Sequence, residues 1–158
     1  MNPRKFNALS TSECETITQH LLDLESRGLY EIWRVANSPA FYNPPIGLQT
    51  LYKLRDEVSK VVGLDLQPTY SYGRIYRNGN KLPRHIDRKA SEFGVSITTY
   101  STTDWPLYFE VDGNETKEVC GVGEGIIYKG SETPHWRNDF RGELQVQLLV
   151  FYVDSDGQ

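Results

Sequence analysis

An apolar repeat within the first 30 residues is typical of an amphipathic helix. Its positions recur at i, i+4 and i+7 and are Ile17, Leu21 and Leu24. Two overlapping capping-box patterns, in which a serine is followed three residues later by a glutamate, begin at Ser10 and Ser12. Gly28 follows the repeat, and glycine commonly ends a helix. The sequence therefore predicts a helix from Ser12 to Arg27.

A second helical pattern follows a proline-rich stretch. Residues 38–47 contain three prolines, and we expect a loop there because proline interrupts helices and strands. One face of the next segment is marked by Leu48, Leu51, Arg55, Val58 and Val62. Gly63 ends this second predicted helix. We expect both helices to cover the outside of a sheet.

After Gly63 the pattern changes to short runs of aromatic and β-branched residues between Gly, Asn and Asp turns. The predicted strands cover residues 70–77, 94–101, 107–111, 116–120, 125–128, 134–138 and 144–153. Two helices followed by this series of short strands predict an α+β fold: a double-stranded β-helix (jelly-roll) core with the N-terminal helices packed outside. We expect one domain over residues 1–158, with helical support at about 10–63 and the core at about 67–153.

Composition agrees with one packed domain. Of the 158 residues, 38% are hydrophobic and 12% aromatic, which favours a globular core over disorder. No stretch approaches about 18 consecutive apolar residues, so no transmembrane helix is predicted. The basic N-terminus lacks an apolar run behind it, and Cys14 and Cys120 are most simply reduced thiols. We therefore expect a cytoplasmic protein with no membrane partner.

Charge is unevenly distributed along the chain. Residues 74–89 contain six cations and one acid, a net +5, whereas the whole chain carries −4 and the remainder therefore −9. One interpretation is a solvated loop. The other is a basic rim that attracts an anionic cosubstrate or an acidic polymer. The segment is too short to establish nucleic-acid binding by itself.

The candidate chemistry centres on His85-Ile86-Asp87 and a later histidine, His135. Two imidazoles and one carboxylate can occupy one face of an octahedral metal and leave three adjacent positions open, an arrangement that suits non-haem Fe(II). In an extended segment residues i and i+2 share a face, so His85 and Asp87 converge at a strand end. The alternative is a surface-loop histidine beside a turn residue, because this short pattern often occurs by chance. We predict that the three residues form a metal site and are catalytic.

The surroundings of this pattern resemble the Fe(II)/2-oxoglutarate-dependent dioxygenases, and within them the prolyl 4-hydroxylase-like group. The resemblance runs over about residues 70–153, and its main elements are Tyr76, His85, Asp87, Pro106 to Glu110 and His135. It implies bound Fe(II), 2-oxoglutarate and O2 as cosubstrates, and ascorbate as a supporting reductant. It also implies hydroxylation of an unactivated C–H bond, coupled to formation of succinate and CO2 from 2-oxoglutarate.

The resemblance further implies a cation that binds the far carboxylate of 2-oxoglutarate, and here the chain departs from the family. Many relatives have Arg or Lys about ten residues after the second histidine, where this chain has Gln145. Arg137, two residues after His135 on the same predicted strand face, is our first choice because arginine can bind a carboxylate with two hydrogen bonds. Arg141, in a predicted hairpin turn, is the second.

Other polar residues are candidates for the same cosubstrate. Tyr76 matches by spacing a tyrosine that hydrogen-bonds this carboxylate in prolyl hydroxylases; its alternative is an ordinary sheet aromatic. Tyr72 and Arg74 share the strand face of Tyr76 and could line the cavity. Gln147 on the last strand could also face inward. The predicted cofactor-binding set is Arg137, Tyr76, Arg141, Tyr72 and Gln147.

The favoured function is an enzyme that hydroxylates a peptide or protein, at proline or another residue. One alternative is a nucleic-acid demethylase or base oxidase on the same fold, although no Arg or Lys follows Arg141. Another is a cupin-like metal-binding jelly roll without 2-oxoglutarate chemistry, which would usually contain more than the three histidines of this chain. The sequence does not fix the substrate or the oligomeric state, because selective loops adopt conformations that sequence does not specify.

Overall fold

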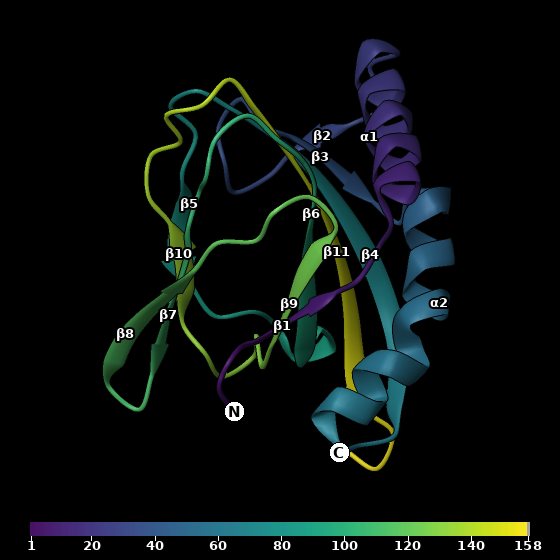
Figure 1. Cartoon of the computed structure of the whole chain (residues 1–158), viewed down its shortest axis with the longest axis vertical. Coiled ribbons are helices and arrows are strands. Elements are labelled where there is room, and N and C mark those ends of the chain that lie inside the picture. The colour runs from purple at the N-terminus through teal and green to yellow at the C-terminus, as the bar shows by residue number, and fades with distance from the viewer. Residues whose placement is uncertain (158) are drawn as a thin grey trace.

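The computed structural model describes residues 1–157 and shows two β-sheets with two helices outside the larger one (Figure 1). The larger sheet has the strand order β1 (Arg4–Asn7), β9 (Glu124–Tyr128), β6 (Phe93–Ser101), β11 (Leu144–Asp154), β4 (Leu66–Arg77), β3 (Pro39–Tyr42) and β2 (Glu31–Ile32). The smaller sheet has the order β5 (Leu82–His85), β10 (His135–Arg137), β7 (Leu107–Val111) and β8 (Asn114–Glu118). All pairings between these strands are antiparallel, and many join segments distant in the sequence.

Helix α1 (Thr11–Ser26) confirms the first helical pattern to within one residue at each end. The Ser10 hydroxyl accepts a hydrogen bond from the Glu13 N–H, and the Glu13 carboxylate accepts one from the Ser10 N–H. This reciprocal pair satisfies two N–H groups that otherwise lack partners at a helix start. On the inner side of α1, Leu21 is fully buried and lies against Gly73 of β4, where a Cβ would approach the leucine to 3.0 Å.

Helix α2 (Pro45–Val62) confirms the second helical pattern, and it ends at Gly63 in the left-handed conformation with φ 82°. The prediction of a loop over residues 38–47 was wrong in part. Strand β3 begins at Pro39 and pairs with β4, and α2 already begins at Pro45. Proline is tolerated at the first position of a strand and in the first turn of a helix, where its missing N–H is not needed.

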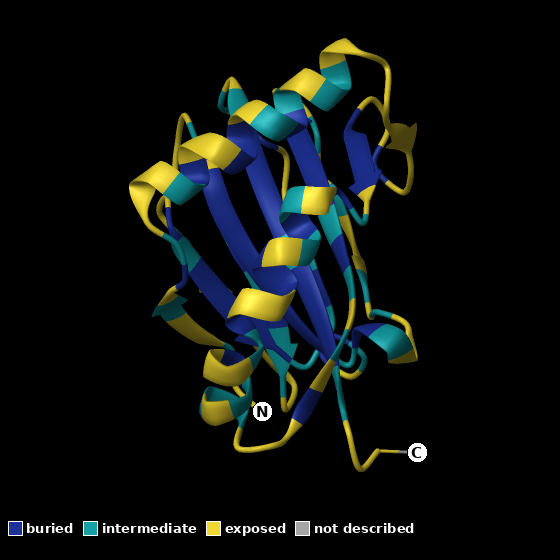
Figure 2. Ribbon diagram, turned by 90° about the vertical axis from the view of Figure 1, so that its right-hand side faces the viewer, coloured by how far each residue is buried: buried dark blue, intermediate teal, exposed yellow. Residues whose placement is uncertain are grey.

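The helices bury the outer face of the larger sheet. Leu51, Leu54 and Val58 of α2 belong to one apolar cluster with strand residues such as Val95 and Val150. A second cluster joins α1 to the same sheet through Ile17, Leu21, Ile75, Val146 and Leu148. Figure 2 shows the buried strands behind helices whose outward surface is exposed. Because the helices cover one face, the other face of this sheet is left to line the space between the sheets.

All seven predicted strands are present, with ends displaced by up to four residues. Four further strands, β1, β2, β3 and β5, were not predicted, and each has four residues or fewer. These four strands have too few alternating positions to display a period-2 pattern, so tertiary pairing defines them; β10, equally short, was predicted only as part of the longer segment 134–138. Within residues 1–157, no helix combines the length and the apolar character needed to cross a membrane.

Candidate metal centre and its cavity

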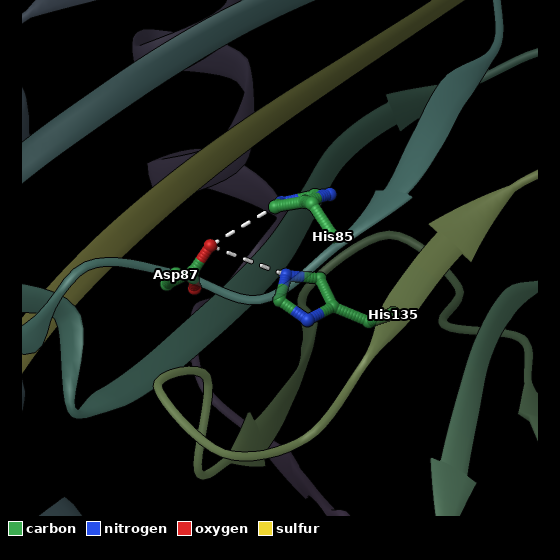
Figure 3. Close-up of side chains that lie close together, drawn as sticks. All are labelled: His85, Asp87 and His135. Carbon is green, nitrogen blue, oxygen red and sulfur yellow. Dashed lines mark ion pairs between the residues drawn. The ribbon is translucent and has the colours of Figure 1, made fainter.

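The three predicted metal ligands come together at one end of the smaller sheet (Figure 3). His85 is the last residue of β5, His135 is the first residue of β10, and the two are directly paired in the antiparallel register. Asp87 follows β5, and its backbone N–H donates to the Gly130 carbonyl at 2.8 Å. Two strand ends and one backbone hydrogen bond therefore fix all three side chains.

The side-chain geometry directs three acceptor atoms at a common point. Asp87 Oδ1 lies 3.2 Å from His85 Nε2 and 3.4 Å from His135 Nε2. One ligand atom from each residue lies within 4.8 Å of the other two. The His135 side chain is 3% exposed, and those of His85 and Asp87 are 13% and 14% exposed. The group is therefore largely shielded from solvent but reachable from one side.

Hydrogen bonds to backbone carbonyls select the tautomer of both histidines. His85 Nδ1 lies 2.7 Å from the Pro83 carbonyl, and His135 Nδ1 lies 2.8 Å from the Thr133 carbonyl. Because a carbonyl oxygen only accepts, each Nδ1 carries the proton and donates it. In the neutral ring, Nε2 then carries no proton, and its lone pair points toward Asp87 and is free to bind a metal ion. This backbone support is the usual arrangement behind a metal-bound histidine.

Asp87 is held as a carboxylate at the centre of the group. Burial alone would raise its pKa, but when both imidazoles are protonated their Nε2–H groups donate to the carboxylate, and these hydrogen bonds from His135 and His85 outweigh burial and hold the pKa well below its usual range. Its second oxygen, Oδ2, is buried and has no hydrogen-bond partner within residues 1–157. Three converging acceptors repel one another unless protons or a cation lie between them. The donor set and this unpartnered oxygen therefore fit a divalent metal ion.

His85, Asp87 and His135 line a cavity of about 480 Å³ between the two sheets. Its walls include inward-facing residues of β4 and β11, among them Tyr72, Arg74, Tyr76 and Gln147. Gln147 Nε2 donates to Ser96 Oγ at 2.8 Å, and its Oε1 accepts from Gln145 Nε2 at 2.9 Å. The cavity thus combines a metal-binding edge with a polar wall on the larger sheet.

Arg137 lies inside this cavity. It is 5% exposed, donates from Nη1 to the Trp105 carbonyl at 2.8 Å, and places its guanidinium 4.7 Å from the centre of the Trp105 ring. Burial lowers its pKa, and the titratable groups that affect it are Tyr76, Cys120 and Tyr128, none of them a carboxylate. A buried cation without a counter-ion is costly, so this residue favours an anion in the cavity.

Of the other residues predicted to bind the cosubstrate, three lie at the cavity and one is exposed to solvent. Tyr76 is 4% exposed and contacts Trp105 edge to face, with ring centres 4.8 Å apart. Tyr72 and Gln147 also line the cavity. Arg141 does not: its side chain is 83% exposed and lies near Asp139 in the outer turn. The structure therefore does not bring the second-choice arginine to the cavity, because the turn projects into solvent.

Sequence reasoning did not identify two aromatic residues that shape the site. Tyr128 of β9 is fully buried, and its ring centre lies 4.8 Å from that of His135. The Trp105 ring lies between those of Tyr76 and Phe140, with ring centres 4.8 Å and 4.7 Å away. Neither has a local motif. Alternation along β9 indicates which of its residues share a face, but only the paired sheets show that this face meets His135.

Comparisons with solved structures agree with this architecture, whereas no family model and no curated protein matches the sequence. A prolyl-4-hydroxylase from Pseudomonas putida superposes with a TM-score of 0.79 at 15% identity, covering 96% of this chain and 92% of that one. HygX from Streptomyces hygroscopicus, with nickel and 2-oxoglutarate bound, gives a TM-score of 0.79 at 10% identity, covering 98% and 83%.

A third similar structure is a prolyl hydroxylase from Trichoplax adhaerens in complex with a hypoxia inducible factor peptide fragment. It gives a TM-score of 0.73 at 13% identity, covering 99% of this chain and 87% of that chain. At these identities the likeness establishes the fold. The chain therefore has the prolyl 4-hydroxylase-like fold of the 2-oxoglutarate-Fe(II) oxygenases.

Proposed function

We propose that this protein is a non-haem Fe(II)/2-oxoglutarate-dependent dioxygenase that hydroxylates an unactivated C–H bond. The observation that carries the proposal is the convergence of His85, Asp87 and His135 in a cavity that also contains a buried arginine. The two-sheet fold, which we interpret as the predicted double-stranded β-helix, resembles that of solved prolyl hydroxylases and 2-oxoglutarate-Fe(II) oxygenases.

His85, Asp87 and His135 are the proposed ligands of Fe(II). Two imidazoles and a carboxylate leave coordination positions for 2-oxoglutarate and O2. When bound, these groups supply the oxidant: one oxygen atom of O2 enters the substrate C–H bond and the other enters succinate, with release of CO2. The protein's part is to hold the ligand set, orient the substrate and limit the access of water.

Arg137 is the proposed partner of the far carboxylate of 2-oxoglutarate. It lies two residues after His135 on β10, is buried, and has no carboxylate among the titratable groups that affect it. Tyr76 and Gln147 line the same cavity and offer further hydrogen bonds. Gln145, where relatives often have a cation, is buried beside Gln147 and cannot supply a charge. Arg137 therefore replaces the missing cation from a different strand.

A peptide or protein is the favoured substrate. The named neighbours from Pseudomonas putida and Trichoplax adhaerens are prolyl hydroxylases, and the second was solved with a peptide. Residues that line the cavity also include Trp33 and Tyr42, which are 60% and 57% exposed and can contact a chain lying across the opening. Prolyl hydroxylation is thus the first activity to test.

The test is product analysis with purified protein, Fe(II), 2-oxoglutarate, ascorbate and a library of proline-containing peptides under ¹⁸O2. We expect succinate to form and one ¹⁸O atom to enter a peptide, as measured by mass spectrometry. An Asp87→Ala variant should form neither product, whereas Asp139→Ala, which changes an exposed acid in a turn, should match the wild type. Stimulation by oligonucleotides and by no peptide would instead assign a nucleic-acid substrate.

A further inference from the structure

The cavity contains a second buried arginine that the proposed cosubstrate does not require. Arg74 of β4 is 4% exposed and lines the same cavity as the metal ligands. Its Nη2 donates to the Trp33 carbonyl at 2.7 Å. Its Nη1 is buried and has no hydrogen-bond partner within the described residues 1–157. One side of this guanidinium is thus anchored, and the other is left with an unmet donor.

Tyr72 presents a second unmet group beside Arg74. Its hydroxyl is also buried without a partner in the described part of the chain. The two residues share a face of β4 by alternation, and the Arg74 guanidinium carbon lies 5.5 Å from the centre of the Tyr72 ring. Burial raises the pKa of Tyr72 by more than the nearby Arg74 guanidinium lowers it. The hydroxyl therefore remains protonated at neutral pH and can donate to an acceptor.

A shared acceptor would satisfy both residues. An unpaired buried donor is costly, and an unpaired buried charge more so, unless a ligand supplies the missing partner. Guanidinium and phenol together match an anion with two oxygens, above all a carboxylate. Glu31 also lines the cavity, but it is exposed, and the Nη atoms of Arg74 do not hydrogen-bond to it. The geometry therefore favours binding of an anion from outside the chain beside Arg74 and Tyr72.

The position of Arg74 distinguishes it from Arg137. Arg137 lies on β10, the strand that carries His135, whereas Arg74 lies on the larger sheet. Contacts run from Arg74 to Tyr76 at 5.8 Å, from Tyr76 to Trp105, and from Trp105 to Arg137. Arg74 donates a hydrogen bond to the backbone carbonyl of Trp33, a residue that is 60% exposed. Arg74 thus contacts the segment that carries the exposed Trp33 and lies on a different sheet from Arg137.

Charge balance gives the same assignment. The charges of Fe(II), Asp87, doubly ionised 2-oxoglutarate and Arg137 cancel one another. Arg74 then remains as a buried cation whose counter-ion must come from another ligand. In a hydroxylase the remaining ligand is the primary substrate.

We propose that Arg74 and Tyr72 bind a carboxylate of the primary substrate. The inference rests on the proposed function and narrows it: the hydroxylated molecule carries a carboxylate that reaches inside the cavity. Tyr72, assigned from the sequence to the cosubstrate, is reassigned to this substrate-binding pair. Within the favoured peptide class, such a carboxylate is the C-terminus or an acidic side chain close to the modified residue; a small free acid offers the same chemistry.

Binding of matched acid and amide pairs tests this proposal without turnover. Protein loaded with Mn(II) and 2-oxoglutarate in the absence of O2 is titrated calorimetrically with N-acetyl derivatives of proline, leucine and tyrosine and with their carboxamides. Pentapeptides with free or amidated C-termini form a second arm. We expect at least one acid to bind tenfold or more tightly than its amide. A preference among the N-acetyl amino acids indicates a small acid as substrate, and a preference among the pentapeptides indicates a peptide.

Variants on β4 assign the preference to Arg74. Arg74→Met should reduce the acid-to-amide ratio to below threefold, Arg74→Lys should retain part of it, and Tyr72→Phe should lower it moderately. Arg77→Met is the matched control, because Arg77 lies on the same strand but is exposed and paired with Glu25. Its ratio should equal that of the wild type.

The outcomes separate the inference from the proposed function. If the wild type binds 2-oxoglutarate but no acid more tightly than its amide, the substrate assignment of Arg74 is wrong and the proposed function stands. If Arg74→Met loses 2-oxoglutarate binding while Arg137→Met retains it, Arg74 is the cosubstrate anchor and the inference is again overturned. Failure of the metal-loaded wild type to bind 2-oxoglutarate contradicts the proposed function and the inference with it.

Discussion

At the scale of single residues, the proposed metal centre depends on which ring nitrogens of His85 and His135 already form hydrogen bonds. The carbonyls of Pro83 and Thr133 accept the Nδ1 protons of the two histidines and leave both Nε2 atoms for a metal. A neutral imidazole without such support can rotate and exchange tautomers. The backbone therefore prepares the ligand set before any cation arrives, which lowers the entropy cost of binding one.

Arg137 gives a prediction at this scale. Replacing it with methionine removes the proposed pair with the far carboxylate of 2-oxoglutarate, which should cost about 2–4 kcal/mol and weaken 2-oxoglutarate binding by roughly 30- to 1000-fold. Arg137→Lys should restore only part of the affinity, because an ammonium cannot reproduce the two-pronged contact. Calorimetric titration of metal-loaded protein measures both effects. A normal affinity in Arg137→Met, or a large loss in the exposed-site control Arg141→Ala, would show that the anchor lies elsewhere.

At the scale of secondary-structure elements, the site is a product of strand pairing. β5 and β10 contribute the two histidines from paired positions, and the segment that follows β9 holds Asp87 through the Gly130 carbonyl. β10 has only three residues, and its register is irregular between His135 and Arg137. Such irregularities recur next to active sites, where they redirect a side chain. Here the strand presents both a proposed metal ligand, His135, and the buried Arg137.

Gly130 provides a test of this arrangement. A Cβ at this position would overlap the Asp87 carboxylate and approach the Ser91 carbonyl to 3.1 Å. Gly130→Ala should therefore displace a metal ligand and weaken metal binding by about 10- to 100-fold, the range found when support of a ligand is lost. Gly121→Ala is the control, because its Cβ would meet only the end of the Glu124 side chain, at 3.2 Å.

Mn(II) binding and thermal unfolding should be measured for both glycine variants. We expect Gly130→Ala to lose metal affinity in a protein that still unfolds cooperatively. Metal binding equal to that of the wild type would mean that Asp87 does not need its present position.

The elements also show how far the sequence alone could lead. Both helices were predictable because the Ser10 and Glu13 capping box and Gly63 are local signals. The convergence of His85 and Asp87 was predictable because they are two residues apart at a strand end, and their role as metal ligands stays a prediction. The proposed role of Arg74 was not predictable from the sequence. Tyr72 and Tyr76 lie on the same face of β4, and alternation does not tell which of these side chains lacks a hydrogen-bond partner. That information exists only after β4 packs against distant segments.

At the scale of the whole molecule, the basic segment of residues 74–89 is divided by folding. Arg74 is buried, Arg77 is paired with Glu25, and Arg84 is paired with Glu110 while lying over the Trp136 ring. The cations that remain exposed and have no ion pair among residues 1–157 are Lys81, Arg88 and Lys89. The segment is therefore not a continuous basic surface, because half of its cations already have a structural role.

This division predicts weak and salt-sensitive binding to nucleic acid. Three available cations neutralise at most three phosphates, so a plot of log affinity for single-stranded DNA against log salt should have a slope of about −2. Binding should vanish near physiological salt, where the Debye length is roughly 8 Å. Fluorescence anisotropy at several salt concentrations measures the slope. Tight binding that resists salt would contradict a peptide or small-acid substrate and favour the nucleic-acid alternative.

The most direct measurement of the central claim is binding of Fe(II) and 2-oxoglutarate to purified protein in the absence of O2. We expect the wild type to bind one metal ion, and to bind 2-oxoglutarate tightly only when the metal is present. His135→Ala should lose metal binding and with it tight binding of 2-oxoglutarate, whereas His20→Ala, which changes a histidine on α1 outside the cavity, should behave as the wild type. Undiminished metal binding in His135→Ala, or 2-oxoglutarate binding that does not depend on the metal, would contradict the account.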